Sequence, residues 1–169
     1  MDWFTSDTHF GHSMLIREDK RPFSTVEEMD QILIANWNRR VSPQDTVYHL
    51  GDFTLGRDHD KYLNQLNGNK ILIIGNHDRK QALKVATGWS AIYPLLELKK
   101  DKRPIVLCHY AMRVWNRSHY GSLHLYGHSH GKLAPTTQSC DVGVDCWNFY
   151  PILLEEAIER MRLFENDVI

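Results

Sequence analysis

The sequence predicts an α/β fold. In its first half, short apolar runs alternate with segments of helical periodicity, and in its second half several strand-like runs follow one another. A second observation is that Asp, Asn and His residues stand directly after five of the apolar runs. The length of 169 residues suits a single domain over residues 1–169, with a sandwich of two or three layers.

Caps and apolar patterns define the elements of the first half. Thr25 and Glu28 have the spacing of a capping box, which predicts a helix that continues to Arg40. Basic residues at that end suit the helix dipole. The other elements expected here are strands over residues 2–5, 45–50 and 70–74, and helices over 58–66 and 81–86.

The second half is expected to be richer in strands. The charged residues 99–103 predict a hairpin connection between strands over 92–98 and 104–108. Further strands are expected over 123–126 and 139–144, and an acidic start predicts a closing helix over 155–164.

Charge and cysteine content exclude several classes of protein. Lys and Arg number 20 against 21 Asp and Glu, so bulk electrostatic binding of nucleic acid is not expected. Three cysteines without a CxxC pair exclude a disulfide framework and favour a reducing compartment. Neither a membrane span nor a signal peptide is expected, which predicts a cytoplasmic protein without a membrane partner. No feature indicates an oligomeric state.

Histidine is unusually frequent, with 10 residues in 169. These histidines are dispersed between His9 and His130, so they do not form a tag. Histidine is the commonest metal ligand and titrates near neutral pH. The composition therefore points to metal or proton chemistry.

Five polar segments follow the predicted strands: residues 7–9, 51–52, 75–78, 109 and 127–130. Ligands of open α/β sheets bind beyond the carboxyl ends of the strands, so these segments are expected to converge. Residues two apart in an extended segment point the same way. Asp7 and His9 are therefore expected to share a face, as are His128 and His130.

The segments together provide seven oxygen or nitrogen donors and no thiolate: Asp7, His9, Asp52, Asn76, His109, His128 and His130. Seven donors exceed the needs of one metal ion but suit two ions that share a carboxylate. Imidazole and carboxylate ligands suit divalent transition metals, Mn foremost, with Fe, Zn, Ni or Co as alternatives. His77, left over beside Asn76, is suited to act as a general acid.

The order Asp-x-His, Gly-Asp, Gly-Asn-His-Asp, His, Gly-His-x-His resembles the calcineurin-like metallophosphoesterases. The hexapeptide Asp-Thr-His-Phe-Gly-His at residues 7–12 and the stretch 142–145 resemble a compact bacterial and phage-type branch. The resemblance implies an αββα four-layer sandwich with a di-metal site at the carboxyl ends of the strands.

The resemblance also implies roles for individual residues. One metal would be held by Asp7, His9, Asp52 and His130, and the other by Asp52, Asn76, His109 and His128, with Asp52 bridging. His77 would be the acid, and Asp78 would orient it.

This chemistry suits a phosphodiesterase. Two cations would neutralise the phosphoryl oxygens, hydroxide bridging them would attack in line, and His77 would protonate the departing alkoxide. The expected substrate is a small phosphoester, such as a nucleotide or short nucleic acid, with monoesters as an alternative. A catalytically weak or inactive binding scaffold of the same fold and a structural metal-binding protein are the other hypotheses. The presence of His77 and all seven donors favours the enzyme.

Other polar residues have two interpretations each. His12, Arg17, Arg113 and His119 are candidate substrate contacts, with loop packing or a solvated surface as the alternative. The 75–78 segment, taken alone, could be a simple turn. His49 and His124 are expected to be packed inside strands, and His59 to be solvated.

Overall fold

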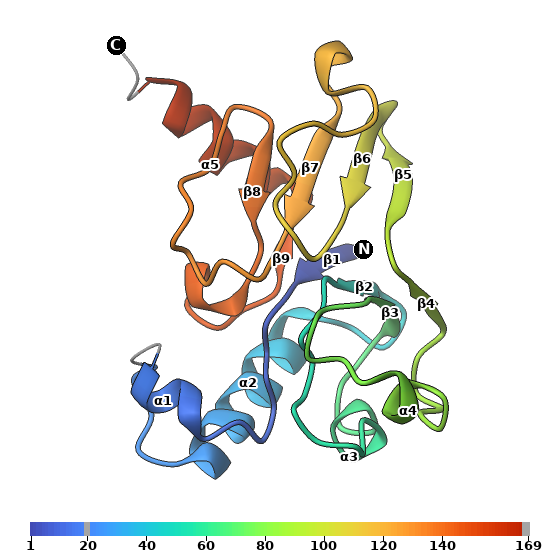
Figure 1. Cartoon of the computed structure of the whole chain (residues 1–169), viewed down its shortest axis with the longest axis vertical. Helices are drawn as coiled ribbons and strands as arrows, with labels where there is room; N and C mark the ends of the chain where they lie inside the picture. The colour runs from blue at the N-terminus through green and yellow to red at the C-terminus, as the bar shows by residue number, and fades with distance from the viewer. Residues whose placement is uncertain (19–20, 167–169) are drawn as a thin grey trace.

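The computed structural model describes residues 1–18 and 21–166. Two β-sheets lie at the centre and are flanked by helices (Figure 1). The first sheet has five strands in the order β4-β3-β2-β1-β9, and the second has four in the order β5-β6-β7-β8. The predicted α/β class and the αββα arrangement are confirmed.

Parallel pairing brings the polar strand ends to one edge of the first sheet. Strand β1 (Asp2–Thr5) lies parallel to β2 (Thr46–His49), which lies parallel to β3 (Asn69–Ile73). Short β9 (Ile152–Leu153) closes the far side of β1 in antiparallel orientation. The segments that contain Asp7, Asp52 and Asn76 therefore leave the sheet at the same edge.

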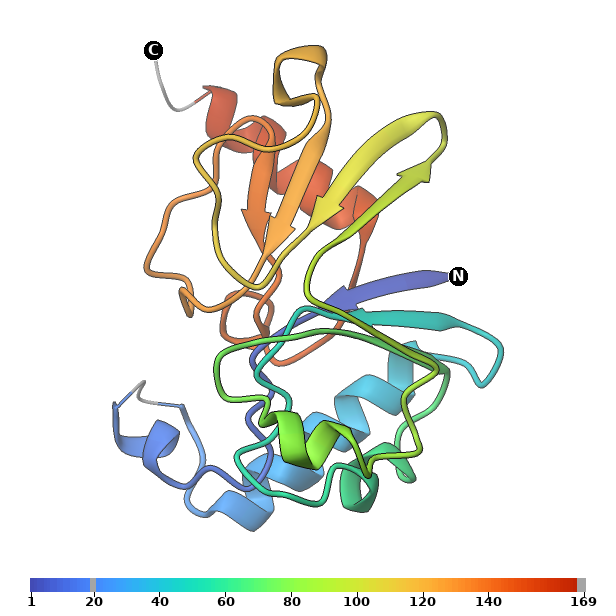
Figure 2. The ribbon, with the colours of Figure 1, turned by 45° about the vertical axis from the view of Figure 1, so that its right-hand side comes forward.

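The second sheet contributes two more polar segments. Strands β6 (Arg103–Leu107), β7 (Leu123–Tyr126) and β8 (Ser139–Asp141) are parallel, so His109 and His128 also follow carboxyl ends. In Figure 2 the arrows of β6, β7 and β8 point toward the ends of β1 and β2. All five polar segments thus meet where the two sheets adjoin.

The helices are α1 (Met14–Glu18), α2 (Val26–Arg40), α3 (Asp60–Leu63), α4 (Lys80–Leu83) and α5 (Leu154–Asn166), with 3-10 turns η1 (Ser118–Tyr120) and η2 (Val144–Cys146). The N-cap is confirmed, since the Glu28 amide donates to Thr25 Oγ1 at 3.1 Å, but the Glu28 carboxylate reaches one residue further back than in a capping box and accepts from the Ser24 amide at 2.7 Å. Helices α3 and α4 are shorter than expected. In the described part of the chain, no helix is long and apolar enough to cross a membrane.

One predicted strand is divided between the two sheets. The expected strand over 92–98 is in fact β4 (Ala91–Tyr93) in the first sheet and β5 (Leu96–Lys100) in the second. Pro94 lies between them and has no N–H for a ladder, so pairing stops there. The charged hairpin is confirmed between β5 and β6, with Asp101 and Lys102 at φ 48° and 69° in its turn.

Two hydrophobic cores fix this arrangement. One contains Met29, Leu33 and Trp37 of α2 packed against the first sheet. The other contains Phe4 of the first sheet, Leu125 of the second and residues of α5. Burial of both faces of the first sheet explains why its parallel strands are rich in aliphatic residues.

Three further histidines that are not candidate ligands are buried. His49 and His124 are packed as expected, but the prediction that His59 is solvated was wrong, because only 1% of it is exposed. Its Nδ1 accepts the indole N–H of Trp89 at 3.3 Å. His59 was expected to be exposed because of its position in the sequence alone. Its partner Trp89 lies 30 residues later and could not be inferred from that position.

These buried histidines predict a loss of stability in acid. Burial lowers the pKa of His49 from 6.5 to about 3 and also lowers the pKa values of His59 and His124. The unfolded chain therefore binds protons below about pH 6.5 that the folded chain excludes, so stability present above that pH is lost as the pH falls toward the folded pKa values.

Urea unfolding of EDTA-treated parent and His59→Asn protein between about pH 7.5 and about pH 5.5 measures the contribution of His59, because the opposite contribution of Asp7, whose pKa burial raises, is common to both. His59→Asn keeps an acceptor for Trp89 and removes one titrating ring, so its stability should fall less steeply. Each pKa unit of difference corresponds to about 1.4 kcal/mol. Equal slopes for the variant and the parent would show that His59 does not contribute.

Candidate metal centre

Left-handed turns, rather than extended strands, carry most of the candidate ligands. Positive φ angles occur at Asp7 (55°), His9 (49°), Asp52 (57°), His128 (66°) and His130 (47°). Such conformations cost of order 1–3 kcal/mol each outside glycine and concentrate at functional sites. The expectation that these pairs share the face of an extended segment was wrong, because the turn geometry directs their side chains.

Backbone hydrogen bonds hold the turns in place. The Asp7 amide donates to Gly51 O and the His9 amide to Asp52 O, both at 3.0 Å. The Asp7 carboxylate in turn accepts the His128 amide at 2.9 Å through Oδ2. The turns that follow β1, β2 and β7 are thus bonded to one another directly.

Two glycines of the motifs stand where neighbouring turns approach too closely for a side chain. A Cβ at Gly75 would collide with Oδ1 of Asp52, and a Cβ at Gly127 would collide with Oγ of Ser6. The glycines of Gly-Asn-His-Asp and Gly-His-x-His therefore allow neighbouring turns to approach without a side chain between them.

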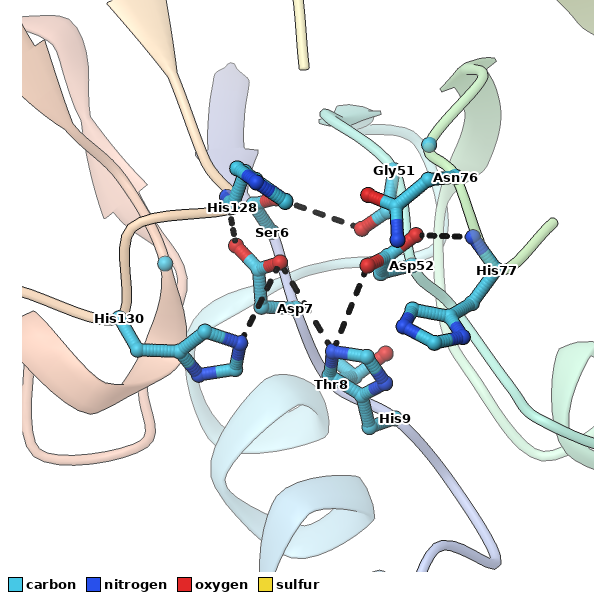
Figure 3. Close-up of polar contacts among 12 residues, drawn as sticks. Ser6, Asp7, Thr8, His9, Gly51, Asp52, Asn76, His77, His128 and His130 are labelled. Atoms are coloured by element: carbon cyan, nitrogen blue, oxygen red, sulfur yellow. Dashed lines mark hydrogen bonds and ion pairs between the residues drawn. The ribbon is translucent and has the colours of Figure 1, made fainter. Parts of the chain in front are cut away.

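The first cluster consists of Asp7, His9 and His130 (Figure 3). Nε2 of His9 and Nε2 of His130 each lie 3.9 Å from Asp7 Oδ1. Asp7 Oδ1 and His9 Nε2 are buried and have no hydrogen-bond partner. Buried polar atoms are rarely left unpaired, so a cation among these three side chains fits the cluster.

The second cluster consists of Asp52, His109 and His128. His109 Nδ1 lies 2.7 Å from Leu50 O, which leaves Nε2 facing Asp52 Oδ2 at 3.5 Å. Asn76 Oδ1 lies 2.9 Å from the same Nε2 and could be a further ligand. The same Asp52 Oδ2 is 3.6 Å from His9 Nε2, so this oxygen lies between the two clusters.

The electrostatics of the clusters also fit a cation. Burial raises the pKa of Asp7 to about 7 and lowers the pKa of His9 to about 2. Burial would raise the pKa of Asp52 as well, but its hydrogen bond to His109 and the nearby positive charge outweigh it and lower the pKa to about 2. A divalent ion would stabilise the charged form of Asp7 and use the lone pair of neutral His9.

His77 lies beside the clusters without belonging to either. Its amide donates to Asp52 Oδ1 at 2.8 Å, and its ring centroid is 5.4 Å from that of His9, edge-on (Figure 3). Its ring is half-buried. His77 is thus positioned to act on a group held at the clusters.

The structure gives Asp78 contacts other than the predicted one with His77. The two carboxylate oxygens of Asp78 accept the amides of Asp52 and Gly75, both at 2.8 Å, and of Phe53 at 3.0 Å. Within the described residues, the Asp78 carboxylate forms no hydrogen bond with the ring of His77. Asp78 instead joins the turn after β2 to the turn after β3.

Of the four candidate substrate contacts, His12 has a ring contact with a residue of the clusters. His12 is half-buried, with its ring centroid 5.4 Å from that of His9 and 6.2 Å from that of His77. Arg17 is exposed on α1 and lines a separate cavity of about 240 Å³. Arg113 is exposed on the loop after β6 and forms no ion pair with any described residue.

His119 lies at the other end of β7. It belongs to η1, which precedes β7, whereas His128 follows β7. Its ring packs against Tyr120, with centroids 4.2 Å apart. The expectation that His119 lines the pocket is therefore not supported by the fold.

Three further residues contact the clusters and were not predicted. Tyr110 is 48% exposed, with its ring 5.0 Å from His109 and 4.7 Å from His128. Tyr110 directly follows the candidate ligand His109 in the sequence, and this position could have indicated that it lies at the site. Arg21 and Asp145 form a buried pair behind His130, but they are 124 residues apart and no motif links them.

Comparisons with known proteins agree with this geometry. The family described as calcineurin-like phosphoesterase matches residues 3–152. The uncharacterized protein MJ1445 of Methanocaldococcus jannaschii is 32% identical over 171 residues, covering 95% of this chain and 90% of that protein. The Gene 66 protein of Mycobacterium phage L5 is 26% identical, covering 86% of each.

A solved structure shares the fold. The protein of unknown function AQ665 from Aquifex aeolicus superposes with a TM-score of 0.70 at 26% identity, covering 92% of this chain and 96% of that one. The family match and the 32% identical relative each extend over most of the sequence. They confirm the resemblance seen in the motifs: this chain belongs to the calcineurin-like phosphoesterase family.

Proposed function

We propose that the chain is a metal-dependent phosphodiesterase that cleaves small, nucleotide-like esters. Membership of the family supports hydrolysis of phosphoesters, and the finer assignment rests on the clusters. The observation that carries it is the position of Asp52 Oδ2, 3.6 Å from His9 Nε2 and 3.5 Å from His109 Nε2. One carboxylate shared between two sets of nitrogen ligands suits a two-metal site.

The metal ligands in this proposal are those expected from the motifs. Asp7, His9 and His130 would hold one divalent ion, Asn76, His109 and His128 would hold the other, and Asp52 would serve both. Two such ions supply charge neutralisation at the phosphoryl oxygens and lower the pKa of water. Manganese is the first candidate, and Fe, Zn, Ni and Co suit the same ligands.

His77 is the proposed general acid. Its amide is bonded to the carboxylate that both clusters share, so the backbone of His77 is held beside the clusters. It donates a proton to the departing alkoxide, which is a poor leaving group without one. His12, whose ring centroid lies 5.4 Å from that of His9 and 6.2 Å from that of His77, is a proposed contact for a phosphoryl oxygen.

The surroundings favour a small ester. His128 is exposed and Tyr110 is 48% exposed, so the second cluster is open to solvent. The net charge of −1 does not favour a grip on long duplex nucleic acid. Three unpaired cysteines suit a reducing compartment, which supports the cytoplasm as the proposed location.

A metal-reloading experiment tests the proposal. Protein treated with EDTA and reloaded with Mn²⁺, Ni²⁺, Co²⁺ or Zn²⁺ should bind about two ions per chain and hydrolyse bis(p-nitrophenyl) phosphate faster than p-nitrophenyl phosphate. Glu159→Gln, an exposed substitution on α5, is the control and should change neither result. Failure to bind any of these metals would contradict the proposal. Metal binding without turnover of either ester would support the scaffold hypothesis.

A further inference from the structure

A buried guanidinium lies behind the first cluster. The Arg21 side chain is fully buried although no helix or strand contains it. Its Nη2 donates to Asp7 O at 2.6 Å and its Nη1 to Thr8 O at 3.0 Å. Arg21 thus holds the backbone of the turn from which Asp7 and His9 project.

The same guanidinium reaches the third ligand through a carboxylate. Nε and Nη2 of Arg21 donate to the two oxygens of Asp145, each at 2.8 Å. Asp145 Oδ2 lies 2.8 Å from His130 Nδ1. A carboxylate at that nitrogen accepts its proton, so Nε2 of His130 keeps a lone pair that faces Asp7.

All three side chains of the first cluster are therefore connected to one arginine. Asp7 and His9 are held through their turn, and His130 is held through Asp145. The bidentate geometry restrains the planes of both the guanidinium and the carboxylate. Such a network limits the reorganisation needed when a cation binds.

The second cluster has weaker support. His109 is fixed by Leu50 O, but His128 and Asn76 are exposed. Within the described ranges the His128 ring forms no hydrogen bond and contacts the rings of His109 and Tyr110 edge-on. Asn76 Oδ1 contacts His109 Nε2 at 2.9 Å, and neither exposed side chain forms a hydrogen bond with a described residue outside the cluster.

We propose that Arg21 and Asp145 are positioning residues that make the Asp7–His9–His130 cluster the tighter of two unequal metal sites. The inference rests on the proposed function, because it concerns the same clusters. Loss of hydrogen-bond partners of this kind weakens metal binding by about 10–100-fold. At limiting metal the protein fills the first cluster, and the ion at the second cluster exchanges with solution.

Calorimetric titration of the EDTA-treated full chain with Mn²⁺ tests this asymmetry. The parent should show one tight and one weak class of site. Asp145→Asn should weaken the tight class by about 10–100-fold and leave the weak class unchanged. Arg21→Lys keeps the charge but loses the planar fork, so its effect should be smaller and in the same direction. His128→Ala should remove the weak class alone.

A buried carboxylate elsewhere supplies the matched control. Asp45 is 5% exposed and accepts the indole N–H of Trp3 at 3.0 Å, but it precedes β2, whereas Asp52 follows it. Asp45→Asn should lower the melting temperature without changing either class of site. This control separates a loss of stability from a loss of ligand positioning.

The outcomes separate the two proposals. If Asp145→Asn and Arg21→Lys bind Mn²⁺ as the parent does, even with lower melting temperatures, the pair is structural and the inference is overturned. If Asp145→Asn does not fold, the Mn²⁺ titration of Arg21→Lys tests the inference instead. If the parent shows two equal classes, the inference fails and the proposed function stands. A parent that binds no metal overturns both.

Discussion

Asp52→Asn is expected to remove bound metal from both clusters and to lower phosphodiester hydrolysis by about 10³-fold or more. Oδ2 of Asp52 is the oxygen that lies within 3.6 Å of Nε2 of both His9 and His109. Asparagine preserves the shape and can still accept the His77 amide, which now lies 2.8 Å from Oδ1. The substitution therefore removes the shared charge while it keeps the turn.

Metal analysis after gel filtration, together with turnover of bis(p-nitrophenyl) phosphate, measures this effect. Loss of a single metal would indicate that Asp52 serves one cluster. Retention of about two ions would contradict the shared role altogether. Glu159→Gln removes an exposed carboxylate on α5 and is the control for a change in net charge.

His77→Ala is expected to leave metal content unchanged and to lower kcat by about 10²–10⁴-fold on an ester with an alkoxide leaving group. The ring of His77 belongs to neither cluster, so its loss removes no ligand. The effect should be much smaller for a p-nitrophenyl ester, because p-nitrophenolate departs without protonation. The measurement is the ratio of the two kcat values, a methyl nucleotide ester against its p-nitrophenyl analogue.

Equal losses on both esters would contradict proton donation and assign His77 to substrate binding. A fall in metal content would indicate that His77 is a ligand. His119→Ala is the matched histidine control, since His119 is exposed at the opposite end of β7. It should change neither the metal content nor the ratio.

Much of the fold was predictable because its signals are local. Apolar runs located most of the strands, and the Thr25 N-cap marked the start of α2, where the Glu28 amide bonds to Thr25 Oγ1. The divided strand at Pro94 was not predicted. Proline ends a ladder, but which sheet each half joins depends on partners distant in sequence.

The burial of His59 was missed for a related reason. Its partner Trp89 lies 30 residues later, and only the packing of the folded chain brings the two rings together. Asp78 shows the same limit, because its three backbone donors come from two different turns. For Asp78 the expected partner was its sequence neighbour His77, but the folded chain places backbone amides of two turns against its carboxylate.

The sequence by itself determined the family and the candidate ligands. Each ligand lies in a short segment that follows an apolar run, and parallel pairing brings such segments together whatever the details of packing. Only the tertiary structure showed how the ligand side chains are oriented and which residues hold them in place. The left-handed turns at Asp7 and His9 and the pairing of Arg21 with Asp145 depend on backbone geometry and on contacts across the whole chain, which no local pattern encodes.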